Sequence, residues 1–280
     1  MTLSEMRSLL AEHNIRLTKS LGQNFLYDVN QIRKIVSAAD IQKNDNVLEI
    51  GPGLGPLTEH LIPSAGLVMA VEKDKRLAEI LKQRFSDAKN FQLICDDALD
   101  FVKNKNWNDW IVVSNLPYSV ASPILVELSK NEYPPKKLTV TVQLEVAQRI
   151  IAQHSEDDYG LLSLFIQLRY LPQGFFKIPA SCFFPAPKVD SACITMTRRE
   201  KELLTNDQRE LFYKIIKRAF SQRRKIMMKL IKSDFPNIKD AFTTLNISAD
   251  ARGESISLNQ YVELTKFISS QNNIRDTLPE

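Results

Sequence analysis

Short apolar runs alternate with helix-like stretches along the chain, and this alternation restricts the fold more than any other feature. Between the runs, residues 75–85 carry apolar side chains at helical spacing. Seven runs have the length and apolar character of strands: residues 46–50, 66–72, 91–95, 110–114, 138–144, 173–178 and 191–197. Such a chain is expected to form a mostly parallel sheet with helices on both faces, and to bind ligands beyond the carboxyl ends of its strands.

The character of the chain changes after the last of these runs. The stretch 198–210 is highly charged and is expected to link two domains. Beyond it, apolar residues recur at helical spacing in a stripe from Leu211 to Phe220. The sequence therefore predicts an α/β domain over residues 1–199 and a small all-α domain over residues 205–280.

The net charge of +4 is carried by the C-terminal part of the chain. Residues 201–280 hold 14 Lys and Arg against 10 Asp and Glu, whereas the 23 basic and 23 acidic residues before them balance. Within this part, the stretch 214–232 contains eight basic residues and no acid, and Arg223, Arg224 and Lys225 are adjacent in it. Such a run predicts binding to a polyanion such as RNA. The alternative is an ordinary solvated helix face.

Composition disfavours several classes of protein. No apolar run approaches the roughly 18 residues of a membrane span, and the N-terminal stretch lacks the features of a secretory signal. The three cysteines and three histidines share no close spacing, so neither a disulfide framework nor a metal site is expected. We therefore expect a soluble cytoplasmic protein that binds no metal.

A glycine-rich turn follows the first strand-like run. Residues 49–55 read EIGPGLG, and glycines allow both a sharp turn and a close approach of the backbone to a ligand. The dinucleotide pattern G-x-G-x-x-G would need glycine at position 56, which is Pro56. The spacing is instead G-x-G-x-G, preceded by Glu49. A purely structural turn would also explain this pattern.

Two acids follow the next two strand-like runs. Glu72 ends the second run, 21 residues after Gly51, where a carboxylate can accept both ribose hydroxyls of an adenosine. Asp97 follows the third run, where it can accept from the exocyclic amine of adenine. Either acid alone would also fit a helix N-cap or a solvated loop. Together with the glycine turn, the pair resembles the S-adenosylmethionine site of class I methyltransferases, with its Rossmann-like sheet.

The fourth run ends in the tetrapeptide Asn115-Leu116-Pro117-Tyr118. The Asn115 side-chain oxygen and the Leu116 carbonyl could accept the two N6 hydrogens of an adenine and leave its lone pair facing a methyl donor. Pro117 would make the turn rigid, and Tyr118 would stack on the base. Preorganised dipoles of this kind suffice for methyl transfer without a strong base. A tight turn is the alternative.

Longer motifs carry a resemblance to a known family. The chain resembles the KsgA-type rRNA adenine dimethyltransferases from about residue 16 to residue 265. The matching pieces are KSLGQNFL (19–26), LEIGPGLGPLTE (48–59), VEKD (71–74), DAL (97–99), NLPY (115–118), QLEVAQRI (143–150), FFPAPKVDSA (183–192), AFSQRRK (219–225) and RGESISLNQY (252–261).

The resemblance implies a reaction and its partners. It implies that S-adenosyl-L-methionine is the donor and that N6 of two adjacent adenosines in the 3′-terminal hairpin of small-subunit (16S) rRNA is dimethylated. It also implies a monomer that acts on the immature small ribosomal subunit late in assembly. The segment GQNFL would fold over the methionine end of the donor. The residues that it implies as donor contacts are Asn24, Leu26, Gly51, Glu72, Asp97 and Asn115.

Two departures and three rival interpretations remain. Leu144 stands where the family usually has a basic residue, and Ser119-Val120-Ala121 replaces the commoner Asn-Ile-Ser/Thr.

An Erm-type enzyme acting on large-subunit rRNA shares the catalytic domain, but NLPY, PAPKVDSA and RGESIS favour the KsgA type. A catalytically idle RNA-binding factor is disfavoured by the complete donor motif, and an NAD enzyme is disfavoured by Pro56.

Overall fold

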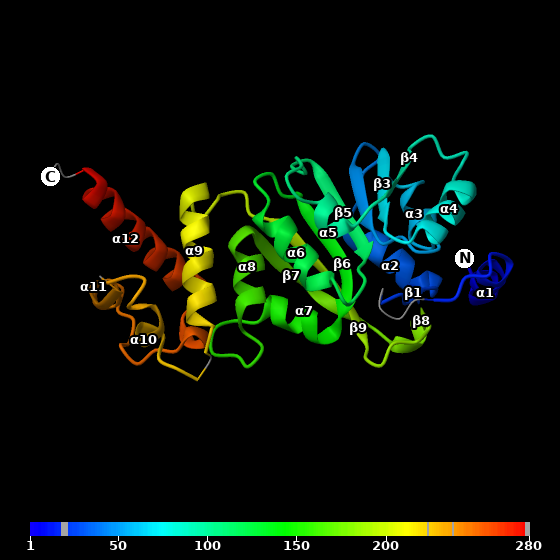
Figure 1. Ribbon diagram of the computed structural model, residues 1–280. Coiled ribbons are helices and arrows are strands. Elements are labelled where there is room, and N and C mark those ends of the chain that lie inside the picture. The colour runs from blue at the N-terminus through cyan, green and yellow to red at the C-terminus, as the bar shows by residue number, and fades with distance from the viewer. Residues whose placement is uncertain (18–21, 223, 237, 278–280) are drawn as a thin grey trace. The chain divides into compact units, whose positions relative to one another are not determined.

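The computed structural model describes residues 1–17, 22–222, 224–236 and 238–277 (Figure 1). By their internal contacts they form two compact units. The first unit comprises Met1–Ala147 and Leu171–Arg198, and the second comprises Gln148–Tyr170 and Arg199–Glu280. The predicted α/β fold is confirmed for the first unit.

The first unit is built on a seven-stranded sheet. Its strands lie in the order β4-β3-β2-β5-β6-β9-β7, and the five on the β4 side are parallel to one another, whereas β9 is antiparallel to β6. A separate pair, β1 (Phe25–Leu26) with β8 (Phe183–Phe184), is antiparallel. The strands of the large sheet are β2 (Asn46–Ile50), β3 (Leu67–Glu72), β4 (Phe91–Cys95), β5 (Trp110–Asn115), β6 (Lys137–Gln143), β7 (Tyr170–Ile178) and β9 (Ser191–Arg198).

Helices connect these strands because the chain has to return to start each parallel strand. On α2, apolar residues at helical spacing bury Ile32, Ile35 and Ala39 against the sheet, and Asp28 caps the helix by accepting from the backbone of Gln31 at 3.0 Å. The helices of this part of the chain are α1 (Leu3–Glu12), α2 (Val29–Ala39), α3 (Thr58–Leu61), α4 (Lys75–Arg84), α5 (Ala98–Phe101), α6 (Ala121–Lys130) and α7 (Leu144–Ile151).

The strand order reverses between β2 and β5. The two strands pair from Asn46 to Leu48 and then separate. Beyond that point the Ser114 hydroxyl bridges them, since it accepts from the Ile50 backbone N–H at 3.2 Å and donates to the Ile50 carbonyl. Parallel sheets bind their ligands at such a reversal, so the topology locates the site before any side chain is considered.

The second unit is helical. Its core includes Phe212, Ile215, Ile216 and Ala219 of α9, as the apolar stripe predicted, and Phe242 of α11. The Tyr261 hydroxyl of α12 is buried and donates to the Gly253 carbonyl at 3.0 Å. The elements of this unit are α8 (Leu161–Arg169), α9 (Asn206–Ala219), α10 (Met227–Ile231), α11 (Ile238–Thr244), η3 (Gly253–Ser255) and α12 (Leu258–Thr277).

The division of the chain differs from the sequence prediction in two details. Residues 148–170 group with the second unit because α8 packs on α9, where the rings of Phe165 and Tyr213 stack at 4.9 Å. The linker is also shorter than 198–210. Thr205 caps α9 in a reciprocal capping box with Gln208, so the helix begins at Asn206 despite the charged composition.

Candidate active site

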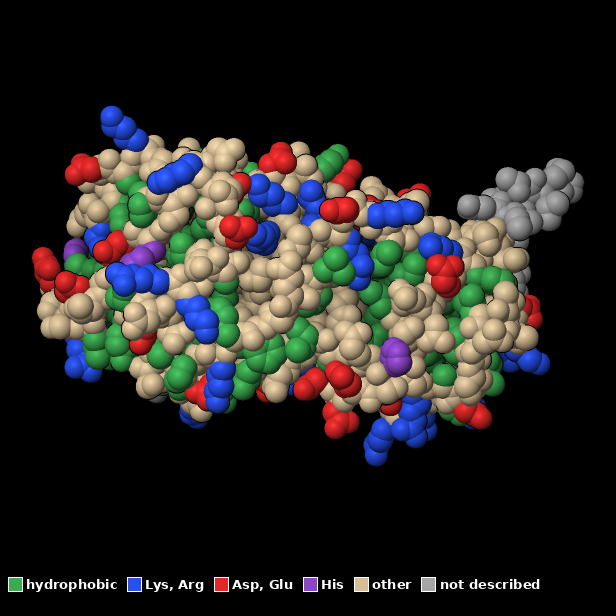
Figure 2. All heavy atoms as spheres, turned by 180° about the vertical axis from the view of Figure 1, so that it is seen from behind, with side chains coloured by type: hydrophobic (Ala, Val, Ile, Leu, Met, Phe, Trp, Pro, Cys, Tyr) green, Lys and Arg blue, Asp and Glu red, His purple; other side chains and the backbone are tan. Residues whose placement is uncertain are grey.

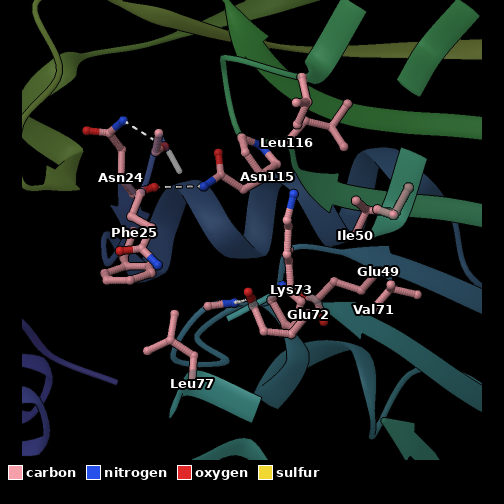
Figure 3. Close-up of a pocket in the computed structure, with 18 of the residues that line it drawn as sticks. Asn24, Phe25, Glu49, Ile50, Val71, Glu72, Lys73, Leu77, Asn115 and Leu116 are labelled. Atoms are coloured by element: carbon pink, nitrogen blue, oxygen red, sulfur yellow. Dashed lines mark hydrogen bonds between the residues drawn. The ribbon is translucent and has the colours of Figure 1, made fainter. Parts of the chain in front are cut away.

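A cavity lies where the strand order reverses, beyond the carboxyl ends of β2, β3 and β5 (Figure 3). Its lining comes from the segment 22–26 and from the loops after these strands and β4. The structure therefore brings together residues that are up to 102 positions apart in the chain, from Gly22 to Ile124. All the residues that the sequence proposed for the donor and for catalysis line this cavity: Asn24, Leu26, Gly51, Glu72, Asp97, Asn115, Leu116, Pro117 and Tyr118. Their individual roles stay predictions.

Two glycines of the turn after β2 are required by their surroundings. Gly51 has φ +67°, and a Cβ atom there would lie 3.1 Å from Cγ of Pro117. Gly53 has φ +64°, and a Cβ atom would lie 2.5 Å from the ring of Phe25. Both backbone conformations favour glycine; a Cβ atom at Gly53 would also force the Phe25 ring to shift, and one at Gly51 would crowd Pro117. The turn is thus packed between the NLPY loop and the segment 22–26, with its backbone facing the cavity.

The Glu72 carboxylate is oriented by backbone donors. It is 7% exposed and accepts from the Gly53 N–H at 3.0 Å through one oxygen and from the Asp74 N–H at 2.9 Å through the other. Burial raises the pKa of Glu72, and these hydrogen bonds oppose that rise. Each carboxylate oxygen can accept a second bond, so the group retains acceptor capacity for two ribose hydroxyls.

A second buried acid, Glu49, lies on the same cavity wall. Its carboxyl is 1% exposed and accepts from the Thr58 hydroxyl at 2.6 Å. Burial, reinforced by the charge of Glu72, raises the pKa of Glu49 to about 8. Glu49 is therefore mainly protonated at neutral pH. In the sequence it was merely the acid that precedes the glycines.

Asp97 caps the short helix α5 and also pairs with a lysine. One of its oxygens accepts from the Leu99 N–H at 2.9 Å, and the other lies 2.6 Å from Nζ of Lys73. The lysine hydrogen bond is the main cause that lowers the pKa of Asp97, so the carboxylate is ionised. Lys73 also lines the cavity. Apart from its position next to Glu72, no pattern in the sequence singled it out.

Asn115 presents an acceptor to the cavity. Its Nδ2 donates to the main-chain oxygen of Asn24 at 2.9 Å, as the dashed line in Figure 3 marks. Its Oδ1 is buried and, among the residues that the structure describes, has no hydrogen-bond partner. The Asn24 side chain donates to the Gly22 carbonyl at 3.2 Å, so Asn24 both holds its own segment and orients Asn115. An unpartnered buried oxygen in a cavity is suited to a ligand that carries N–H groups.

Tyr118 shares a hydrogen bond with a residue that the sequence did not indicate. Its phenolic hydroxyl and Oγ of Ser191 lie within hydrogen-bond distance, and Ser191 is fully buried at the start of β9. Burial raises the pKa of Tyr118, so the phenol is neutral. Ser191 lies in the quoted motif PAPKVDSA, but nothing in that motif revealed what the hydroxyl contacts.

The basic stretch lies in the second unit. Arg224 and Lys225 are exposed in the turn between α9 and α10, whereas Arg223 lies outside the residues that the structure describes. Arg218 pairs with Asp234 at 3.1 Å, so its charge is partly compensated. Over the face drawn in Figure 2, Lys and Arg side chains are interspersed with Asp and Glu. The described basic residues of this stretch are all exposed: Lys214, Lys217, Arg218, Arg224, Lys225, Lys229 and Lys232.

Other features of the described residues bear on the predicted class. All three cysteines are free, with Cys95 exposed and Cys182 and Cys193 buried. Within the described ranges, no group of three or more His, Cys, Asp or Glu side chains could hold a metal ion. In the same ranges, no helix combines the length and the apolar character needed to cross a membrane.

The fold and the cavity define a class I methyltransferase that uses S-adenosylmethionine. The structure is similar to that of a dimethyladenosine transferase from Plasmodium falciparum, with a TM-score of 0.77 and 24% identity, covering 89% of this chain and 98% of that one. It is also similar to the 23S rRNA methyltransferase ErmE, with a TM-score of 0.67 and 25% identity, covering 88% of this chain and 99% of that one.

Sequence comparison defines the family. The family model for ribosomal RNA adenine dimethylase matches residues 14–270. A relative from Clostridium perfringens (strain SM101 / Type A), a ribosomal RNA small subunit methyltransferase A, is 39% identical over 273 residues, which are 95% of this chain and 96% of the relative. The chain therefore belongs to the ribosomal RNA adenine dimethylases, as the motifs predicted, and is an rRNA methyltransferase.

Proposed function

We propose that this enzyme dimethylates N6 of two adjacent adenosines in the 3′-terminal hairpin of small-subunit (16S) rRNA. The observation that carries the proposal is the buried Oδ1 of Asn115 at the wall of the donor cavity, which has no hydrogen-bond partner within the described part of the chain. The choice of the small subunit is supported by the 39% identity to a small-subunit methyltransferase, against 25% to ErmE. A turn alone would not need the hydrogen-bond acceptor that Asn115 of the NLPY motif offers. An adenine amine could donate to this oxygen, so the motif supports adenine as the base that is methylated.

The residues of the cavity fit the donor. Glu72 would accept the ribose hydroxyls, Asp97 would accept from the adenine amine, and the turn at Gly51 would let the backbone approach the ligand. When bound, the sulfonium supplies an activated methyl group, so the site needs no metal or strong base. The acceptor nitrogen forms the new N–C bond as the S–C bond breaks, and the N6 proton is released to water.

On the acceptor side, two groups of the NLPY loop would hold the base. Oδ1 of Asn115 and the carbonyl of Leu116 would accept the N6 hydrogens and direct the nitrogen lone pair toward the methyl group. Tyr118 would stack on the ring and offset part of the cost of removing the base from its helix. Because these groups are fixed before the base arrives, little reorganisation remains for the transfer step.

The proposal also covers how the enzyme binds RNA and where in the cell it acts. The second unit would bind RNA through its basic stretch, with Arg223, Arg224 and Lys225 at its centre. We propose that the enzyme acts as a monomer on the immature small ribosomal subunit, in the cytoplasm.

Methylation of undermethylated ribosomal subunits tests the proposal. Purified small and large subunits that lack these methyl groups would be incubated separately with the enzyme and methyl-labelled donor, and the modified nucleosides would be mapped by mass spectrometry of RNA fragments. We expect label in two adjacent adenosines near the 3′ end of the small-subunit rRNA. Label in large-subunit rRNA would favour the Erm-type activity, and the absence of label in both would contradict the proposal.

A further inference from the structure

Tyr118 and Ser191 meet at the acceptor edge of the cavity, although they are 73 residues apart in the chain. Tyr118 follows β5 and lines the cavity, whereas the side chain of Ser191 is fully buried. The two hydroxyls share a hydrogen bond. Ser191 itself is not among the residues that line the cavity, so its hydroxyl reaches the cavity through its contact with Tyr118.

The backbone of Ser191 is fixed on both sides. Ser191 pairs with Gln143 in the β6–β9 register, and the neighbouring Asp190 carbonyl accepts from the Leu144 N–H at 3.0 Å. The Asp190 side chain accepts from the Ala180 N–H at 2.9 Å and pairs with Lys177 at 2.7 Å. The hydroxyl of Ser191 thus projects from a rigid part of the sheet.

The backbone before Tyr118, at the other end of the hydrogen bond, is also held by β6. The Leu116 N–H donates to the carbonyl of Thr141 in β6 at 3.1 Å, and Pro117 packs against Gly51. The backbone that precedes Tyr118 is therefore held, but a tyrosine ring can still rotate about its side-chain bonds. A hydrogen bond at the phenolic hydroxyl restricts the swing of the ring about the Cα–Cβ bond and so holds the far end of the ring in place.

We propose that Ser191 is a positioning residue for the methyl acceptor, and that it fixes the position of the Tyr118 ring on which the adenine stacks. This inference rests on the proposed function, because it assumes that an adenine enters the NLPY pocket. A base stacked on a ring that swings about the Cα–Cβ bond would approach the donor from varying positions, and misplacement by about 1 Å can cost roughly 100-fold in rate. The Ser191 hydroxyl would suppress that variation without touching the base.

The bond could instead serve to satisfy a buried hydroxyl at the start of a strand, since buried polar groups generally need partners. The chain offers a matched control for that alternative. Oγ1 of Thr139 and Oγ1 of Thr195 lie 3.3 Å apart and join β6 to β9, the strand that also carries Ser191. Neither threonine lines the cavity. Thr195→Val therefore removes a similar bond between hydroxyls but leaves the acceptor pocket intact.

The test compares kinetics of Ser191→Ala, Tyr118→Phe, the double variant and Thr195→Val. We expect the first two to lower kcat/KM for RNA about tenfold each, with unchanged donor affinity, and the double variant to lose no more than either single variant, because both remove the same bond. Ser191→Thr keeps a hydroxyl and should restore most of the rate. Thr195→Val should keep the wild-type rate.

A fluorescence measurement reads the ring directly. Hairpin RNA with 2-aminopurine in place of the target adenosine should be quenched by stacking on Tyr118, and Ser191→Ala should weaken that quenching. Wild-type kinetics and quenching in Ser191→Ala, or a loss equal to that of Thr195→Val, would overturn the inference. If the wild-type enzyme methylates no small-subunit RNA, the proposed function fails, but the quenching comparison still decides whether Ser191 positions the ring.

Discussion

The side-chain nitrogen of Asn115 donates to the main-chain oxygen of Asn24 at 2.9 Å, and this bond fixes which end of the amide faces the cavity. Since the nitrogen is engaged, the oxygen is the atom left for a ligand. The segment around Asn24 thus determines that Asn115 offers an acceptor rather than a donor. A ligand with N–H groups can donate to this oxygen, whereas a ligand that carries only hydrogen-bond acceptors cannot.

The first prediction concerns this acceptor. Asn115→Ala should reduce methylation by about 100-fold or more, because one preorganised hydrogen bond to the reacting group is lost, whereas RNA binding should change little since Tyr118 remains. Asn115→Asp keeps the shape but replaces the donor to Asn24 with an oxygen, so it should also lose activity. Methyl incorporation and RNA affinity would be measured for each variant.

Product distribution gives a finer readout of the same change. After one methyl transfer N6 keeps a single hydrogen and can use one of the two acceptors, so loss of Asn115 should alter the ratio of mono- to dimethyladenosine. Mass spectrometry of digested rRNA measures this ratio. Asn131→Ala is the control, since it removes an asparagine that donates to the Val102 carbonyl at 3.1 Å outside the cavity. A wild-type rate and ratio in Asn115→Ala would mean that NLPY is only a turn.

The second prediction concerns the donor. Glu72→Gln keeps the size of the side chain but weakens charge-assisted hydrogen bonds, each of roughly 1.5–3 kcal/mol, so S-adenosylmethionine should bind at least tenfold more weakly. Glu72→Ala should weaken it further, because the Gly53 and Asp74 N–H groups also lose their acceptor. Titration calorimetry measures both. The control is Glu79→Gln, because Glu79 is exposed on α4, and this variant should bind the donor as the wild type does. Unchanged donor affinity in both Glu72 variants would exclude a contact between Glu72 and the ribose.

The third prediction concerns RNA. Reversing Arg223, Arg224 and Lys225 to Glu should weaken RNA binding broadly across sequences and flatten its salt dependence, by roughly 0.7–0.9 in the logarithmic slope for each lost phosphate contact. Affinity for a hairpin RNA would be measured from low to high salt. The control reverses Lys75, Lys82 and Lys89, which are exposed in the first unit and change the net charge equally. An unchanged slope in the first variant would mean that the basic stretch is merely solvated.

The fourth prediction concerns stability and pH. The pKa of Glu49 is about 8 in the folded protein, whereas the ordinary value for a glutamate is 4.5. At pH values between 4.5 and 8, Glu49 is therefore protonated more often in the folded protein than in the unfolded chain. The free energy of unfolding should therefore fall as pH rises through this window, by about 1.4 kcal/mol per pH unit from Glu49. The raised pKa of Glu72 acts in the same direction.

Glu49→Gln isolates this contribution, because it removes the titrating group and keeps the acceptor for Thr58. Urea unfolding between pH 5.5 and 8 should show a clearly shallower decline in the variant than in the wild type. Glu79→Gln should retain the wild-type decline. Identical slopes in Glu49→Gln and the wild type would show that Glu49 is already ionised in the folded protein.

Much of the α/β unit was predictable because its signals are local. The runs 46–50 and 91–95 match β2 and β4 at both ends, because each is a short, mainly apolar stretch between polar or turn residues. The helices α1, α2 and α8 and the short β1–β8 pair were not predicted. The pair joins residues that are 157 and 159 positions apart, two from each segment, and is too short to leave a pattern in the sequence.

For the site, the sequence alone determined which residues would converge. Glycines after one strand and acids after the next two must meet, because parallel strands end at one edge of the sheet. The tertiary structure decided how those residues are oriented and charged. The contacts of Asn115 with Asn24, Asp97 with Lys73 and Tyr118 with Ser191 span 91, 24 and 73 residues, and the pKa of Glu49 depends on how completely the fold excludes water. Distances and desolvation arise only when the chain is packed, so no local pattern records them.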